Sequence, residues 1–194
     1  MQVKVCGVTR PEDAALACEL GAWAIGMILS KKGPRHVELA RAKEIRAALP
    51  EDAFAVGVFV DESAKTINQL AAELDLDLVQ LHGDEKPELL LEVECPAVKA
   101  HFIGKTLPDF SPWRNAWATL LEGAKRGDAF DWELARGLDV PSSRVILAGG
   151  LTPENVAKAV SICDPFAVDV SSGVESKPGI KDAAKLRAFF EALA

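Results

Sequence analysis

A lysine and a cysteine stand two residues apart at the start of the chain, in a short apolar run that ends in glycine. Strand side chains alternate between faces, so Lys4 and Cys6 share one side of the predicted strand. A neighbouring cation favours the thiolate, the form of cysteine that acts as a base or nucleophile. Cys6 also falls at the carboxyl end of the strand, where α/β proteins gather their reactive groups. We therefore interpret Cys6 as a candidate catalytic residue; the alternative is a small buried cysteine that packs as a hydrophobe.

Two glycine-containing turns follow the last two apolar runs of the chain. Both turns expose backbone N–H groups, which bind anions well. In a barrel, the loops after the seventh and eighth strands are the usual place for a phosphate. One glycine pair alone would indicate only a turn, but two such turns at adjacent loops predict a phosphorylated substrate. The predicted phosphate ligands are Gly149, Gly150, Ser172 and Gly173.

Three further polar residues follow other apolar runs. Gln80 and His82 are two positions apart, so both could line the mouth of a barrel. Histidine is the residue type usually used for proton transfer near neutrality, although a single histidine such as His82 also fits a hydrogen-bonded structural role. Arg35 follows the second run, and its guanidinium can hold a planar carboxylate by two parallel bonds. Arg35 is therefore a predicted ligand-binding residue, and the alternative is a solvated loop charge.

The elements that must position these residues alternate along the whole chain. Short runs rich in Val, Ile, Leu and Ala alternate with amphipathic, charged segments, which is typical of repeated β-α units. The runs predict strands near 2–6, 23–29, 54–60, 77–81, 97–101, 117–121, 144–148 and 166–170. Helices are predicted over 11–20, 38–49, 64–74, 85–93, 131–136, 152–161 and 182–193. The segment 103–115 contains Pro108 and Pro112, so we expect a poorly formed fifth helix.

Eight β-α units close most simply into a (β/α)8 TIM barrel. The run 53–60 is apolar on both faces, as a parallel sheet covered by helices requires. The alternative is an open doubly wound sheet, but its usual GxGxxG loop is missing after the first strand. With 194 residues, the chain predicts one trimmed α/β barrel domain over 1–194.

Composition narrows the possible partners. The net charge of −7 and the absence of a long basic cluster argue against a nucleic-acid-binding surface. No apolar stretch approaches the roughly 18 residues that span a bilayer, and Met1 leads directly into a strand, so we expect a cytoplasmic protein. The four cysteines lack metal-binding spacing, which predicts reduced thiols and no structural metal. The sequence leaves monomer and homodimer open.

Taken in chain order, these motifs resemble the phosphoribosylanthranilate isomerase family. The match runs nearly end to end, and its most specific parts are the KVCGVT start and the DVSSGVE segment near the end. The segments that carry it are 4–9, 33–35, 58–60, 80–83, 130–132, 147–151, 168–175 and 178–182.

The resemblance implies an Amadori rearrangement in tryptophan biosynthesis, without metal or organic cofactor. N-(5-phosphoribosyl)anthranilate, a small phosphorylated sugar derivative, would become 1-(2-carboxyphenylamino)-1-deoxyribulose 5-phosphate. In that reading, Cys6 is the general base that takes the C2 proton, and Arg35 binds the anthranilate carboxylate. Asp169 matches the acid of the family's last motif and could help to organise the barrel mouth. The alternative for Asp169 is an ion pair with Lys4 inside the barrel.

The sequence departs from the family at the general acid. The family usually has an aspartate at the end of the sixth strand, followed by a GGTG-type loop, whereas this chain has Glu122 and a shorter loop. The extra methylene moves the carboxyl by about 1 Å, in a site where such a shift can cost about 100-fold in rate. We predict that Glu122 is the acid, with Asp128 as the alternative. A raised carboxyl pKa would keep this acid protonated.

Other readings share the phosphate turns. They are a histidine-pathway aminoaldose isomerase, an indole-glycerol-phosphate synthase, a pentose-phosphate epimerase and a non-catalytic phosphate-binding relative. Cys6 and Arg35 separate the enzymes, because the synthase would need a lysine and glutamate pair and the metal epimerases two histidine ligands. The histidine-pathway enzyme would carry an aspartate at the end of the first strand.

Overall fold

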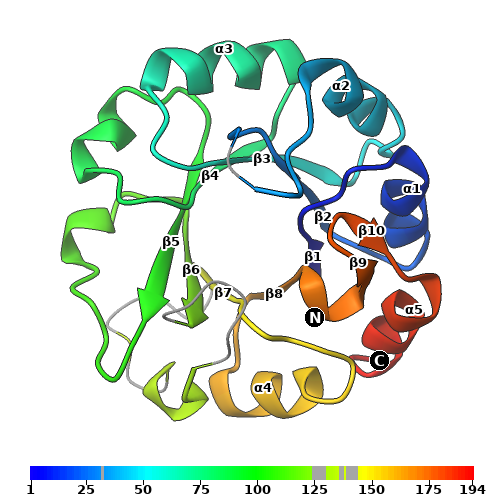
Figure 1. Cartoon of the computed structure of the whole chain (residues 1–194). Helices are drawn as coiled ribbons and strands as arrows, with labels where there is room; N and C mark the ends of the chain where they lie inside the picture. The colour runs from blue at the N-terminus through cyan, green and yellow to red at the C-terminus, as the bar shows by residue number, and fades with distance from the viewer. Residues whose placement is uncertain (32, 124–129, 136–137, 139–143) are drawn as a thin grey trace.

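In a computed structural model, the described part of the chain comprises residues 1–31, 33–123, 130–135, 138 and 144–194. Its main sheet is a closed barrel whose parallel strands follow one another in chain order (Figure 1). The barrel strands are β1 (Gln2–Val5), β2 (Ala24–Ile28), β3 (Phe54–Phe59), β4 (Leu78–Leu81), β5 (Ala97–Ile103), β6 (Ala118–Gly123), β7 (Val145–Leu147) and β8 (Ala167–Val170). The predicted (β/α)8 barrel is therefore confirmed.

Helices surround the barrel, and most lie where the sequence predicts them (Figure 1). They are α1 (Pro11–Glu19), α2 (Leu39–Ala47), α3 (Ala64–Leu74), α4 (Val156–Cys163) and α5 (Ala183–Glu191). No helix in the described ranges is long and apolar enough to cross a membrane. The helix α4 begins four residues later than predicted, because the Asn155 side chain bonds Thr152 N at 2.8 Å and Gly150 O at 2.9 Å and holds a turn there.

Two predicted helices are only 3-10 turns, so those predictions are wrong in type. The segment 85–93 forms η1 (Pro87–Leu91), and its consecutive leucines cannot share one buried stripe, since Leu91 is 83% exposed. The described part of 131–136 forms η3 (Trp132–Ala135), which is one short turn. The proline-rich segment 103–115 holds only η2 (Ser111–Trp113), which confirms the poorly formed fifth helix.

Alternation along the strands fills the barrel and leaves polar residues at one end. An apolar interior cluster comprises Ala24, Val56, Leu78, Val98, Ala100, Ala118, Leu120, Ile146, Ala148 and Ala167. Aromatic rings at the starts of strands pack at the amino end of this cluster, with centroids 5.2 to 6.1 Å apart: Trp23, Phe54, Trp117 and Phe166. Because the amino end is filled with apolar side chains, the inward positions at the carboxyl ends are the ones left for chemistry.

A small hairpin after the last barrel strand was not predicted. The chain leaves β8 through the 3-10 turn η5 (Ser172–Val174) and then forms β9 (Glu175–Lys177) and β10 (Ile180–Lys181), which pair antiparallel. Gly179 makes the turn with φ of 82°, a conformation that glycine adopts without strain. The hairpin lies next to β1, between α1 and α5 (Figure 1). These strands are too short to produce a period-two pattern in the sequence.

Candidate active site

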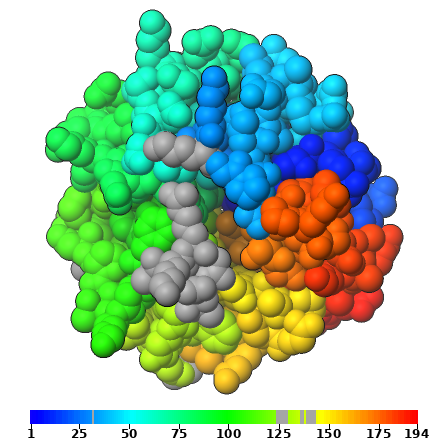
Figure 2. All heavy atoms as spheres, viewed as in Figure 1, coloured from blue at the N-terminus to red at the C-terminus, as the bar shows by residue number. Residues whose placement is uncertain are grey.

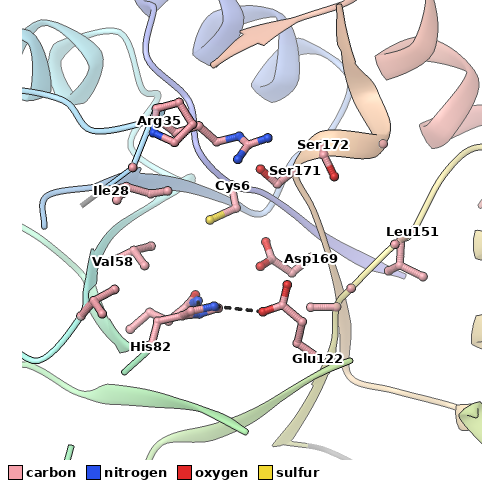
Figure 3. Close-up of a pocket in the computed structure, with 18 residues that line it drawn as sticks. Cys6, Ile28, Arg35, Val58, His82, Glu122, Leu151, Asp169, Ser171 and Ser172 are labelled. Atoms are coloured by element: carbon pink, nitrogen blue, oxygen red, sulfur yellow. Dashed lines mark hydrogen bonds and ion pairs between the residues drawn. The ribbon is translucent and has the colours of Figure 1, made fainter. Parts of the chain in front are cut away.

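One cavity of about 430 Å³ opens at the carboxyl ends of the barrel strands. Figure 3 shows the side chains that line it. The cavity collects all the candidate site residues except Asp128, which lies outside the described residues: Cys6, Arg35, Gln80, His82, Glu122, Gly149, Gly150, Asp169, Ser172 and Gly173. Cys6, Gln80 and His82, which were predicted from their strand positions, therefore line the cavity. Glu122 and Asp169, which the family resemblance supplied, line it too.

A buried ion pair stands beside the cysteine. Lys4 Nζ donates to Asp169 Oδ1 at 2.8 Å, and the register pairs these two residues directly across β1 and β8. This confirms the alternative reading of Asp169, although its side chain also lines the cavity. Gly26 on the neighbouring strand leaves the necessary room. A Cβ there would lie 2.8 Å from Cys6 Sγ and 3.2 Å from Lys4 Nζ.

The Cys6 thiol does not gain the low pKa that its sequence neighbour suggested. Burial raises the pKa of Cys6, and the Lys4 and Lys181 ammonium groups lower it by less. The Asp169 carboxylate also raises it, because Asp169 offsets much of the Lys4 charge. Lys4 thus lowers the pKa of Cys6 as expected, but burial outweighs it, and burial depth cannot be read from two residues in a strand.

A chain of polar contacts leads to Glu122 at the end of β6. His82 Nε2 lies 2.9 Å from Glu122 Oε2 (Figure 3). Gln80 Nε2 lies 2.7 Å from His82 Nδ1. Gln80 contacts the Nδ1 side of the His82 ring, so Nε2 faces Glu122. The second Glu122 oxygen points toward Asp169 in Figure 3. Gln80 and His82 thus line the cavity and also hold the predicted acid.

The guanidinium of Arg35 reaches the cavity rim but already holds one carboxylate. Arg35 Nε donates to Glu175 Oε1 at 2.8 Å, and Arg35 Nη2 donates to Glu175 Oε2 at 2.7 Å. This side-on fork leaves the end of the guanidinium, Nη1 and the second Nη2 proton, as a second bidentate edge. Sequence reasoning assigned no role to Glu175. Chemistry could have pointed to Glu175, because an arginine on a loop needs a partner to fix its orientation.

The two glycine turns meet on the far side of the cavity. Gly149 and Gly150 have φ of 83° and 61°, a conformation that other residues rarely adopt. Gly173 approaches the first turn so closely that a Cβ there would lie 1.9 Å from the Leu151 carbonyl oxygen. The turns therefore lie close together only because Gly173 has no side chain, and their N–H groups can face one anion.

Between these polar ends the cavity has an apolar wall. Ile28 and Val58 face it from β2 and β3 (Figure 3). Val60 and Pro34, from the adjoining loops, also line it. The cavity can thus hold an elongated ligand with two anionic ends and an apolar middle. The residues that could serve as proton donor and acceptor, Glu122 and Cys6, both reach the same space.

Comparison with known proteins agrees with this geometry. The family model of N-(5'-phosphoribosyl)anthranilate (PRA) isomerase matches residues 3–192. The N-(5'-phosphoribosyl)anthranilate isomerase of Trichlorobacter lovleyi is 43% identical over 197 residues, covering 97% of this chain and 96% of that protein. The protein of the same name from Pseudomonas fluorescens is 43% identical over 201 residues, covering 98% and 94%.

Solved structures give the same result. The crystal structure of phosphoribosyl anthranilate isomerase from Thermus thermophilus has a TM-score of 0.91 and 40% identity, covering 100% of this chain and 98% of that one. A phosphoribosyl anthranilate isomerase in complex with reduced 1-(o-carboxyphenylamino)-1-deoxyribulose 5-phosphate has a TM-score of 0.85 and 36% identity, covering 99% and 97%. The chain, matched along nearly its whole length, belongs to the N-(5'-phosphoribosyl)anthranilate isomerase family.

Proposed function

We propose that Glu122 and Cys6 carry the two proton transfers of the isomerisation that gives this family its name. The reaction converts N-(5'-phosphoribosyl)anthranilate to 1-(2-carboxyphenylamino)-1-deoxyribulose 5-phosphate in tryptophan biosynthesis. The observation that carries the proposal is that a carboxyl at the end of β6 and a thiol at the end of β1 enter one buried cavity. An acid and a base within one cavity are what an Amadori rearrangement needs.

The first step belongs to Glu122. Its carboxyl donates a proton to the ring oxygen while the C1–O bond breaks and the nitrogen lone pair forms the C1=N bond. Glu122 is suited to this step because the backbone of β6 and the His82 contact fix its carboxyl at the cavity wall. We assign Gln80 and His82 the task of orienting Glu122, and His82 the task of contacting the opened sugar.

The second step belongs to Cys6. Its thiolate takes the C2 proton, the C–H electrons form a C1=C2 bond, and the C1=N electrons return to nitrogen. The resulting enol amine then gains a proton at C1 and loses the proton of its C2 hydroxyl, whose electrons form the C2=O bond of the ketone. Lys4 Nζ remains charged beside the thiolate: burial lowers its pKa, but Asp169 and Cys6 raise it by more. Because burial raises the pKa of Cys6, kcat/KM is expected to increase with pH beyond the range of an ordinary cysteine.

The remaining residues bind the ends of the substrate. The free edge of Arg35 takes the anthranilate carboxylate, and the wall that includes Ile28 and Val58 takes its ring. Gly149, Gly150, Ser172 and Gly173 bind the phosphate through backbone N–H groups. This placement orients the sugar so that its ring oxygen faces Glu122 and its C2 faces Cys6.

Three variants test the assignment of acid and base. Glu122→Gln keeps the side-chain shape but has no acidic proton, so kcat is expected to fall by about 100- to 10,000-fold with little change in KM. Cys6→Ala is expected to lose activity to a similar degree. Turnover is followed by the loss of anthranilate-type fluorescence after the phosphoribosyl substrate is added. Asp128→Asn is the matched control, and near-normal turnover of Glu122→Gln with an inactive Asp128→Asn would reverse the assignment.

Assembly and location form a separate, simpler proposal. We propose a cytoplasmic protein that is a monomer or a homodimer, which light scattering at assay concentrations would distinguish. The four cysteines are free thiols in the structure. The Thermotoga maritima relative, 36% identical, is described as dimeric.

A further inference from the structure

We propose that Glu175 and Lys181, on the hairpin β9–β10, are positioning residues that hold Arg35 and the backbone of Cys6 in place for the substrate. The inference rests on the roles proposed above for Arg35 and Cys6. Glu175 and Lys181 are not among the described residues that line the cavity. They would therefore act through Arg35 and Cys6, which do line it.

Glu175 fixes the guanidinium before the substrate arrives. Both of its oxygens bind Arg35, at 2.8 and 2.7 Å, and Oε1 also accepts from Gly179 N at 3.2 Å and Lys181 Nζ at 3.1 Å. Glu175 is only 7% exposed, so little water competes for these bonds. An arginine held in advance loses less side-chain freedom when it binds a ligand carboxylate. The pair also determines which edge of Arg35 remains for a ligand carboxylate, since Glu175 occupies the side-on edge.

Lys181 connects the same carboxylate to the cysteine. Its fully buried ammonium donates to Cys6 O at 2.6 Å, Ser171 O at 3.1 Å and Glu175 Oε1 at 3.1 Å. Cys6 O and Ser171 O lie just beyond β1 and β8, which pair with each other in the barrel. One side chain therefore bridges the ends of two strands at the position of the proposed base.

The hairpin itself is tied to the loop that follows Cys6. Thr9 Oγ1 donates to Gly179 O at 2.5 Å, and Lys181 N donates to Asp13 Oδ2 at 3.1 Å at the start of α1. In the space-filling view, the orange segment that contains the hairpin packs directly against the blue start of the chain (Figure 2). Gly7 completes the arrangement, because a Cβ there would lie 2.6 Å from Arg35 Cδ. The hairpin is thus anchored to β1 and α1 and extends to Arg35.

The charges of the cluster require the carboxylate. Burial raises the pKa of Glu175, but Arg35 and Lys181 lower it by more, so Glu175 stays ionised between two cations. Without that charge, Arg35 and Lys181 would repel each other, and Arg35 would lose its only bidentate partner among the described residues. The positioning role therefore depends on the charge of Glu175 and not only on its shape.

Glu175→Gln tests this role with the least change in volume. Because a charge-assisted fork is lost, KM is expected to increase by about 10- to 100-fold, with a smaller decrease in kcat. Lys181→Met is expected to lower kcat more than it raises KM, since it releases the backbone of Cys6. Lys177→Gln, an exposed residue of the same hairpin, is the matched control and should leave both constants unchanged.

A double-mutant cycle with Arg35→Ala decides whether Glu175 acts through Arg35. If it does, Glu175→Gln causes no further increase in KM when Arg35 is already alanine. Equal effects in both backgrounds, or a normal KM for Glu175→Gln alone, would overturn the inference while leaving the proposed function intact. A normal KM for Arg35→Ala would instead overturn the carboxylate-binding role and the inference with it. If Glu175→Gln does not fold, Glu175→Asp replaces it in the cycle, because a shorter carboxylate breaks the fork but keeps the charge.

Discussion

His101 on β5 is predicted to make the fold sensitive to acid. Its ring is 7% exposed and packs edge-on against Phe110 and Trp113, with centroids 4.9 and 6.1 Å away. Its Nε2 is buried and has no hydrogen-bond partner within the described ranges. Burial, with a smaller contribution from Lys99, lowers the pKa of His101 from 6.5 to about 4. The folded state therefore holds this imidazole neutral, whereas the unfolded chain protonates it near pH 6.5.

This difference fixes the sign and the size of the effect. Between pH 6.5 and about 4 the unfolded state binds more protons, so acidification favours unfolding and stability is recovered as pH rises. At about pH 5 the unfolded imidazole is almost fully protonated and the folded one mostly neutral, which removes about 2 kcal/mol of stability relative to about pH 8. For a chain of this length, that corresponds to a decrease of about 4–8 °C in Tm.

The measurement is urea unfolding of the wild-type protein and of His101→Phe at about pH 8 and about pH 5. Phenylalanine keeps the aromatic packing but cannot titrate. Between about pH 8 and about pH 5, the free energy of unfolding of the variant is therefore expected to fall by about 2 kcal/mol less than that of the wild-type protein. Equal losses in both proteins would refute the reasoning. The result also matters for catalysis, because the acid limb of the activity profile reports on the proposed base Cys6 only after the His101 contribution to unfolding is removed.

Two other substitutions test single contacts of the site. Gly173→Ala should force the two phosphate turns apart, raising the dissociation constant for inorganic phosphate by about tenfold or more, as measured by calorimetry. Gly104→Ala, which has open space around its Cβ, is its control, and unchanged binding by Gly173→Ala would contradict the close approach. Asp169→Asn leaves Lys4 buried without its partner, so the free energy of unfolding should fall by about 3–5 kcal/mol, and a loss below about 1 kcal/mol would contradict a buried ion pair. In the same variant the Cys6 pKa should decrease, since Asp169 raises it. The measurement is thiolate absorbance against pH, with the absorbance of the double variant Asp169→Asn, Cys6→Ala subtracted.

Much of the fold and site follows from short-range pattern. A buried parallel strand is apolar on both faces and a helix between strands is amphipathic, so the strand positions of the barrel could be located within a few residues. Parity then indicates which side chains share a face, and together with position at the carboxyl end of a strand it pointed to Cys6 and His82. Glu122 and Asp169 came instead from the family resemblance. The sequence alone could not decide whether Asp169 pairs with Lys4, because the pairing depends on the register of β1 against β8.

The features that were missed depend on contacts between distant residues. Arg35 and Glu175 are 140 positions apart, and the hairpin that carries Glu175 is too short to show a period. The direction of the Cys6 pKa depends on burial by the whole barrel, which outweighs the neighbouring Lys4. The turn η1 replaced a predicted helix because three adjacent leucines, although apolar, cannot all reach the barrel from one helical face.

The proposed acid and base lie in unlike surroundings within one cavity. Cys6 lies near the buried cations Lys4 and Lys181, and both lower its pKa against the effect of burial. Glu122 lies across the cavity with His82 as its contact (Figure 3). Two groups in unlike surroundings can hold different protonation states at one pH, which acid–base catalysis by a pair of residues requires. The protein as a whole carries a net charge of −7 and repels an anionic substrate, so the local attraction must come from the free edge of Arg35 and the backbone N–H groups of the glycine turns.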